Sequence, residues 1–139
     1  SIGNVAGAGA AGGLGGGLVA FFNADLQNGI KLLLDKLDFK EKIRNADLII
    51  TGEGKADRQT TMGKVPFGIL QEAKKQNIPV ILIAGSIEDV EELNDVGFKG
   101  IFSVTPYPID LEQAMQADFT KQNITRLLTQ ICSVIKHNI

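Results

Sequence analysis

Apolar residues in this chain follow two patterns, short continuous runs and positions spaced as on a helix. Continuous runs occupy Asp47–Thr51, Pro79–Ala84 and Gly100–Val104, and each is rich in β-branched or other apolar residues. Such runs predict buried strands, whereas apolar residues that recur every three or four positions predict amphipathic helices. From Asp47 onward the predicted order is therefore strand, helix, strand, helix, strand, helix.

The predicted helices share this spacing and carry local start signals. Pro66 lies in the first turn of one helix, where its missing N–H costs nothing. Ser86 and Asp89 stand three apart, like a capping pair before the next helix. The predicted helices are Ala10–Phe22, Gly29–Leu37, Phe39–Asn45, one that begins at Val65, one that ends near Asp95, and Leu111–Lys136.

Continuous apolar strands that alternate with helices indicate a parallel sheet covered on both faces. The predicted fold class is α/β, with three layers, a mainly parallel sheet and βαβαβα order, like half of a Rossmann or flavodoxin domain. Ligands bind beyond the carboxyl ends of such strands. That rule selects the segments Gly52–Lys64, Gly85–Glu88 and Thr105–Asp110.

The first part of the chain differs in composition from the rest. Residues 1–22 hold eight of the sixteen glycines and no charged residue. We therefore assign residues 1–26 to a glycine-rich helical segment of an adjacent lobe or hinge, and residues 27–139 to the α/β domain. Gly7–Gly12 matches the dinucleotide pattern G-x-G-x-x-G, but no buried strand precedes it, which argues against a nicotinamide or flavin site. Two explanations stay open, an anion cradle at a helix start and close backbone packing.

Bulk composition excludes several classes of protein. Hydrophobic residues make up 44%, charged residues 22%, and the net charge is −2, without the basic stripe of a nucleic-acid binder. No apolar stretch approaches the roughly 20 residues that span a bilayer. The single cysteine, Cys132, favours a reducing compartment, so we expect a cytoplasmic protein. Because the chain starts at Ser1 rather than Met, we expect it to be part of a longer polypeptide.

The segment Thr51–Lys64 carries the richest chemistry. Gly52 and Gly54 are predicted to turn the chain sharply off its strand and to let a ligand approach the backbone. Glu53 and Asp57 supply two carboxylates that could hold Mg²⁺ or take a proton from a hydroxyl.

The same segment carries positive charge suited to phosphate or carboxylate oxygens. Lys55, Arg58 and Lys64 supply it, and Lys64 also stands at a helix start, where the dipole favours an anion. The alternative is a solvated loop whose charges only pair with each other. Position at the carboxyl end of a strand favours the functional interpretation.

Together these motifs resemble the bacterial glycerate kinase family, over essentially the whole chain but over only about the last third of such an enzyme. Two positions depart from the family pattern: Lys55 stands where Arg is common, and Val65 stands where Ala is common. The motifs that carry the resemblance are Gly7–Gly15, Asp47–Gly54, Asp57-x-Gln59-Thr60 with Gly63-Lys64-x-Pro66, and Phe102-Ser103 followed by Leu111–Met115.

The resemblance implies ATP-dependent phosphorylation of D-glycerate to 2- or 3-phosphoglycerate, with Mg²⁺, in a cleft between two domains. Asp57 and Lys64 would then be catalytic, and Glu53 would bind the metal. The missing N-terminal part of the polypeptide would be required for activity, so we expect the fragment alone to be inactive. Whether the protein forms a homodimer stays an open question. The implied substrate- or phosphate-binding residues are Gly9, Gly12, Gly13, Gly52, Gly54, Lys55, Arg58, Gln59 and Thr60. The alternative function is a non-catalytic α/β module that binds a nucleotide or a partner protein.

Overall fold

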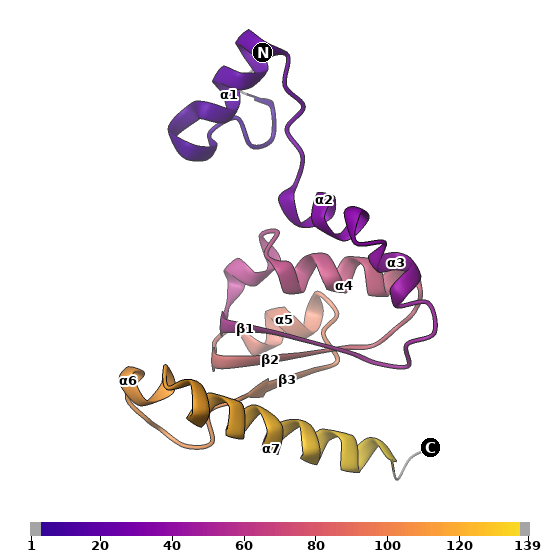
Figure 1. The fold of residues 1–139 in the computed structure, drawn as a ribbon, viewed down its shortest axis with the longest axis vertical. Coiled ribbons are helices and arrows are strands. Elements are labelled where there is room, and N and C mark those ends of the chain that lie inside the picture. The colour runs from indigo at the N-terminus through magenta and orange to yellow at the C-terminus, as the bar shows by residue number, and fades with distance from the viewer. Residues whose placement is uncertain (1–3, 137–139) are drawn as a thin grey trace. The chain divides into compact units, whose positions relative to one another are not determined.

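A computed structural model describes residues 4–136 of the chain. The chain divides into two compact units, Ser1–Phe39 and Lys40–Ile139. The assignment of residues 1–26 to a second lobe or hinge stays a prediction. Figure 1 labels the elements, which are α1 (Ala10–Phe22), α2 (Gly29–Lys36), α3 (Phe39–Lys42), β1 (Ile49–Ala56), the 3₁₀ helix η2 (Arg58–Thr61), α4 (Val65–Lys75), β2 (Val80–Ile87), α5 (Val90–Asp95), β3 (Gly100–Ser103), α6 (Leu111–Ala114) and α7 (Ala117–Lys136).

The glycine-rich start of the first unit is not a continuous helix. Ala11, Gly12 and Gly13 have φ values of 50°, 68° and 95°, so the backbone kinks there and becomes regularly helical only afterwards. Farther along, Gly15 is buried, and a Cβ on it would lie 2.5 Å from the carbonyl oxygen of Gly7. Close packing therefore explains Gly15, and left-handed backbone explains Gly12 and Gly13. The continuous helix predicted over Ala10–Phe22 is wrong in its first turn.

In the second unit the three strands form one parallel sheet in the order β1-β2-β3, which confirms the predicted α/β fold class. Pairing of β1 with β2 runs from Ile49↔Val80 to Ala56↔Ile87. Pairing of β2 with β3 is shorter and ends at Ala84↔Ser103. The carboxyl ends of all three strands therefore lie at one edge of the sheet.

Helices cover the two faces of this sheet, with α4 on one side and α7 along the other (Figure 1). Both crossovers, through α4 and through α5, join neighbouring parallel strands, and right-handed crossovers place the two helices on the same face. Lys74 at the end of α4 accordingly donates a hydrogen bond to the carbonyl of Val96 just after α5. The core lies on this side of the sheet. Its fully buried side chains include Leu70, Val80, Leu82, Leu93 and Phe98.

Three boundaries differ from the prediction for identifiable reasons. The first strand continues through Gly52 and Gly54 to Ala56, because β2 also stays extended and pairs with it. Ser86 consequently belongs to β2, opposite Lys55, and the residue before α5 is Asp89. The long helix predicted over Leu111–Lys136 is split into α6 and α7. At the break, the hydroxyl of Thr120 donates to the carbonyl of Ala114, which satisfies the end of α6.

Within residues 4–136, no helix has both the length and the apolar character that crossing a membrane requires.

Shortening a core side chain of the central strand tests this packing. Leu82 is fully buried, so Leu82→Ala should lower the free energy of unfolding by about 2–5 kcal/mol through lost burial and a residual cavity. Urea unfolding measures the change. Leu111→Ala, at a side chain that is 77% exposed, is the matched control and should change stability by less than about 0.5 kcal/mol. An equal loss in both variants would contradict the assigned core.

Candidate active site at the carboxyl end of the sheet

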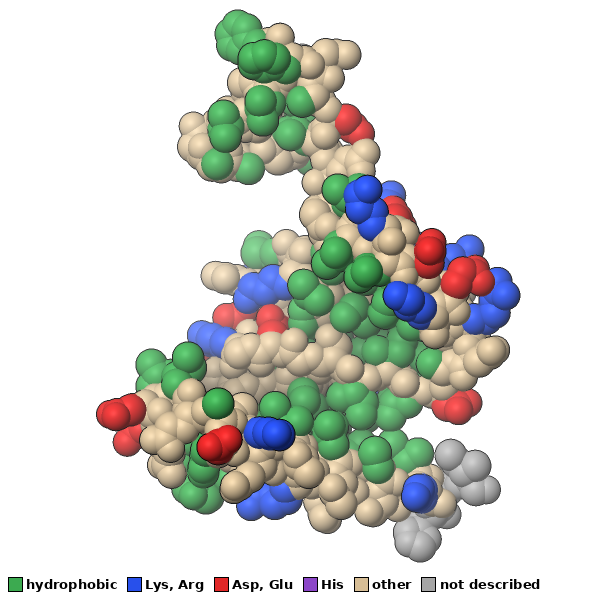
Figure 2. Space-filling model, in the orientation of Figure 1, with side chains coloured by type: hydrophobic (Ala, Val, Ile, Leu, Met, Phe, Trp, Pro, Cys, Tyr) green, Lys and Arg blue, Asp and Glu red, His purple; other side chains and the backbone are tan. Residues whose placement is uncertain are grey.

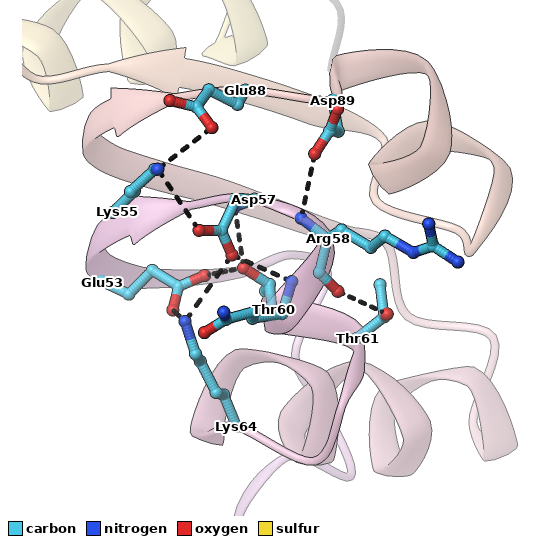
Figure 3. Close-up of polar contacts among 10 residues, drawn as sticks. Glu53, Lys55, Asp57, Arg58, Thr60, Thr61, Lys64, Glu88 and Asp89 are labelled. Atoms are coloured by element: carbon cyan, nitrogen blue, oxygen red, sulfur yellow. Dashed lines mark hydrogen bonds and ion pairs between the residues drawn. The ribbon is translucent and has the colours of Figure 1, made fainter.

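The charged residues of the segment predicted to be functional converge where β1 ends. After Ala56 the chain forms the short helix η2, turns at Gly63 with φ +90°, and starts α4 with Lys64 as the residue preceding its first turn. This path folds the segment back on itself. Figure 3 shows that Glu53 from β1, Asp57 from the strand end and Lys64 point toward one another.

Lys64 lies between two carboxylates. Its ammonium nitrogen is 3.8 Å from Oε2 of Glu53 and 3.7 Å from Oδ1 of Asp57. Both distances exceed the roughly 2.7–3.2 Å of a good hydrogen bond, so the ammonium is held mainly by charge. The side chain of Lys64 is 40% exposed, whereas those of Glu53 and Asp57 are 11% and 15% exposed. The cluster therefore presents a reachable cation backed by two partly buried acids.

Thr60 holds the two carboxylates in place. Its side chain is fully buried, its hydroxyl donates to Oε1 of Glu53, and the same hydroxyl accepts from the backbone N–H of Asp57 at 3.1 Å. The carboxylate of Asp57 in turn accepts from the backbone N–H of Gln59 at 2.9 Å. This hydrogen-bonded turn fixes the distance between β1 and η2.

A second lysine extends the cluster toward β2. Nζ of Lys55 lies 3.0 Å from Oε2 of Glu88 and 3.6 Å from Oδ2 of Asp57. The hydrogen bond and charge of Glu88, followed by the charge of Asp57, raise the pKa of Lys55 above its ordinary value. Lys55 therefore stays protonated at neutral pH and adds positive charge beside Asp57.

Arg58 does not join this cluster. Its guanidinium points toward α5, with Nε 3.6 Å from Oε1 of Glu92, and its side chain is 73% exposed. The backbone N–H of Arg58 donates to the carboxylate of Asp89 at 3.2 Å, and this bond fixes the chain direction (Figure 3). A direct role of Arg58 in binding phosphate stays a prediction.

The predicted glycines have different settings. Gly52 and Gly54 lie within β1, so the sharp turn predicted there is wrong. Gly52 lies close to β2, because a Cβ on it would be 3.0 Å from Cγ1 of Ile83. Gly9, Gly12 and Gly13 belong to the first unit. Their role as a phosphate cradle stays a prediction.

Known proteins that resemble this chain point to one family. The family model described as "Glycerate kinase family" matches residues 1–136. The chain belongs to the glycerate kinase family. A glycerate kinase from Bacillus cereus is 40% identical over 136 residues, which are 97% of this chain and 35% of that protein. The glycerate 2-kinase of Escherichia coli is 41% identical over 133 residues, which are 95% of this chain and 34% of that protein.

A solved structure of the same family supports the fold. The crystal structure of a protein from Salmonella typhimurium LT2, assigned as glycerate kinase 2, matches this chain with a TM-score of 0.71 and 39% identity. The match covers 97% of this chain and 34% of that one. The chain thus spans about a third of the length of the family members that it matches.

Within the cluster, the carboxylates of Glu53 and Asp57 are paired rather than grouped as a metal cage. No group of three or more His, Cys, Asp or Glu residues that could hold a metal ion occurs in residues 4–136. Glu53 and Asp57 nevertheless face the same cation, Lys64. Two carboxylates with water and substrate oxygens are a common Mg²⁺ environment, so the pair suits a metal that arrives with its substrate.

Sequence reasoning missed two residues near this edge of the sheet. Glu88 was placed in a segment predicted to bind ligand, but its ion pair with Lys55 was not predicted. The pair forms because β1 and β2 extend to Ala56 and Ile87. Asn123 on α7 is 8% exposed. Its signal was available, because it stands four residues after Phe119 and four before Leu127, as a polar residue in an apolar row.

Removing one hydroxyl tests the arrangement of the two acids. Thr60→Val keeps the shape of the side chain but leaves Oε1 of Glu53 and the N–H of Asp57 without their partner. The free energy of unfolding should fall by about 1–3 kcal/mol. Thr61→Val is the matched control, because that hydroxyl is half-buried and bonds only the carbonyl of Arg58. Urea unfolding that shows equal losses for both variants would remove Thr60 as the organising residue.

Proposed function

We propose that the protein containing this chain transfers the γ-phosphoryl group of ATP to a hydroxyl of D-glycerate and gives a phosphoglycerate. The observation that carries the proposal is the cluster of Glu53, Asp57 and Lys64 at the carboxyl end of β1, in a member of the glycerate kinase family. Membership in a kinase family indicates use of a nucleotide. Phosphoryl transfer depends mainly on positioning and on neutralising charge, and the cluster offers both.

Lys64 is the residue that would neutralise charge on the transferred phosphoryl group. It lies within 4 Å of two carboxylates, yet at distances longer than a hydrogen bond, and it is substantially exposed. A phosphate oxygen can therefore bind the ammonium without breaking a strong contact. Lys64 also stands where the free N–H groups of α4 begin, which adds a favourable field for an anion.

Asp57 is the residue that would orient the glycerate hydroxyl and accept its proton. In this step the hydroxyl oxygen attacks the γ-phosphorus, the bond to the bridging oxygen breaks, ADP leaves, and the proton passes to the Asp57 carboxylate. The backbone N–H of Gln59 and the charges of Lys55 and Lys64 hold that carboxylate in one orientation. A positioned base of this kind contributes about 10²–10⁴-fold to the rate.

Glu53 would hold Mg²⁺, directly or through water, together with oxygens of the nucleotide. Its Oε1 is occupied by the Thr60 hydroxyl, whereas Oε2 faces the space shared with Lys64. Mg²⁺ bound there would neutralise charge on the β- and γ-phosphates. We place Arg58 outside this arrangement, because its guanidinium faces Glu92.

Replacing the proposed base is the direct test. In the natural full-length protein, Asp57→Asn keeps size and hydrogen-bonding capacity but removes the carboxylate, so glycerate-dependent ADP release should fall about 10²–10⁴-fold. Asp95→Asn, an exposed acid at the end of α5, is the matched control and should keep the wild-type rate. Circular dichroism confirms that both variants fold.

Two outcomes of the same assay would count against the proposal. A near-normal rate of folded Asp57→Asn would remove Asp57 from the chemistry. Wild-type protein that binds ATP but releases no ADP when D-glycerate is added would favour the non-catalytic module instead. The 139-residue chain by itself should show no turnover, because its family relatives are about three times as long.

A further inference from the structure

A pocket separates the second face of the sheet from α6 and α7. Its volume is about 1020 Å³, and all of its lining residues lie in the second unit. The floor is formed by strand residues Gly52, Gly54, Ile83 and Gly85, and the opposite wall by α7. Figure 2 shows hydrophobic side chains gathered between the sheet and α7 on the face that is drawn. Pockets that hold a drug-sized ligand have volumes of roughly 300–1,000 Å³.

Gly54 leaves part of this space open at the end of β1. Successive residues of a strand point to opposite faces, so Gly52 and Gly54 face away from the side on which Glu53 meets Lys64. A Cβ on Gly54 would meet nothing within 4 Å. Most of the pocket therefore lies on the face of β1 opposite the charged cluster, and Glu53 is the cluster residue that also lines it.

Asn123 is the polar residue that makes this pocket more than a packing defect. Asn123 is only 8% exposed and lines the pocket. No hydrogen bond of its side chain occurs within the part of the chain that the structure describes. In the same part, no side-chain nitrogen or oxygen is both fully enclosed and unpaired, so the amide reaches solvent through the pocket beside it. An amide in such a setting needs a ligand or water to satisfy its two donors and its acceptor.

The chemistry of the lining indicates which part of a substrate fits. Ile83, Ile124 and Met115 make the pocket largely apolar. Its charged lining residues are the exposed Lys121, the exposed Asp110 and the half-buried Glu53. A small anion such as glycerate would find no cation inside. A flat, uncharged heteroaromatic ring matches the apolar walls, and its donor and acceptor edge matches the Asn123 amide.

We infer that this pocket binds the purine ring of the nucleotide and that Asn123 hydrogen-bonds its edge. The inference rests on the proposed kinase function, in which one substrate, ATP, has a flat heteroaromatic ring and the other, D-glycerate, has none. Asn123 selects the nucleotide, and Gly54 keeps the floor of the pocket open. The charged cluster on the other face of β1 is left for the phosphates and glycerate.

Two variants of the natural full-length protein test the two parts of the site. Asn123→Leu removes the amide at nearly constant volume, so the Kd for ADP and the KM for ATP should rise about 10-fold, as expected for hydrogen bonds lost from a buried site. The KM for D-glycerate and the kcat at saturating ATP should change less than about twofold, because a uniform binding contribution affects KM alone. The discrimination between ATP and GTP should weaken as well. Gln122→Leu, the same change on the exposed face of α7, is the matched control and should alter none of these values.

Gly54→Val provides an independent variant in case Asn123→Leu folds poorly. The valine side chain enters open space, so the protein should fold, and the Kd for ADP measured by calorimetry should rise at least about 10-fold through steric exclusion. Retention of wild-type ADP affinity in both folded variants would overturn the inference.

Stability and substrate specificity separate this inference from its competitors. If another segment of the natural polypeptide fills the pocket and pairs with Asn123, Asn123→Leu should lower the thermal midpoint and leave ADP affinity unchanged, which would overturn the inference. A rise in the KM for D-glycerate alone would also overturn it. If wild-type protein binds ADP and loses affinity in both variants but shows no glycerate-dependent turnover, the kinase proposal fails while the purine pocket stands.

Discussion

Parallel pairing of β1 with β2 is the interaction on which the site depends. The pairing continues to Ala56↔Ile87, beyond the last rung between β2 and β3, Ala84↔Ser103. Because β2 holds these last residues, β1 stays extended through a segment with two glycines and two charges. Alternation along the extended strand then sends Glu53 to one face and Gly52 and Gly54 to the other. Without these rungs the same residues would be a glycine-rich loop with no preferred direction.

This constraint divides the end of one strand between two kinds of chemistry. On one face, Thr60 ties Glu53 to the backbone of Asp57, and Lys64 returns from α4 to lie between the two acids. On the other face, the missing side chain of Gly54 leaves room in a largely apolar pocket that Asn123 also lines. ATP has a charged end and a flat, uncharged ring. In the proposed function the cluster binds the charged end, and in the further inference the pocket binds the ring.

The pattern of apolar runs was sufficient to predict the order of strands and helices and the parallel sheet, because these runs are buried by the sheet itself. It failed where pairing overrode local preference. Gly52 and Gly54 were expected to leave the strand, and Ser86 was expected to cap a helix. Cross-strand partners instead hold Gly52 and Ser86 in the sheet, and Gly54 stays in β1 between the paired residues on either side of it. The segment Thr51–Lys64 was predicted to be functional from its place at the carboxyl end of a strand, and within it Glu53, Asp57 and Lys64 converge. The outward direction of Arg58 and the bridging role of Thr60 depend on the turn at η2. Its capping box of Asp57 and Thr60 was not recognised in the sequence.

The most direct measurement is a crystal structure of the natural full-length protein with D-glycerate, Mg²⁺ and a non-hydrolysable ATP analogue. We expect a γ-phosphate oxygen within hydrogen-bonding distance of the Lys64 ammonium, and a glycerate hydroxyl within the same reach of the Asp57 carboxylate, roughly 2.6–3.2 Å between heavy atoms. Nucleotide and glycerate bound away from the carboxyl end of β1, with Lys64 still paired only to Glu53 and Asp57, would contradict the account.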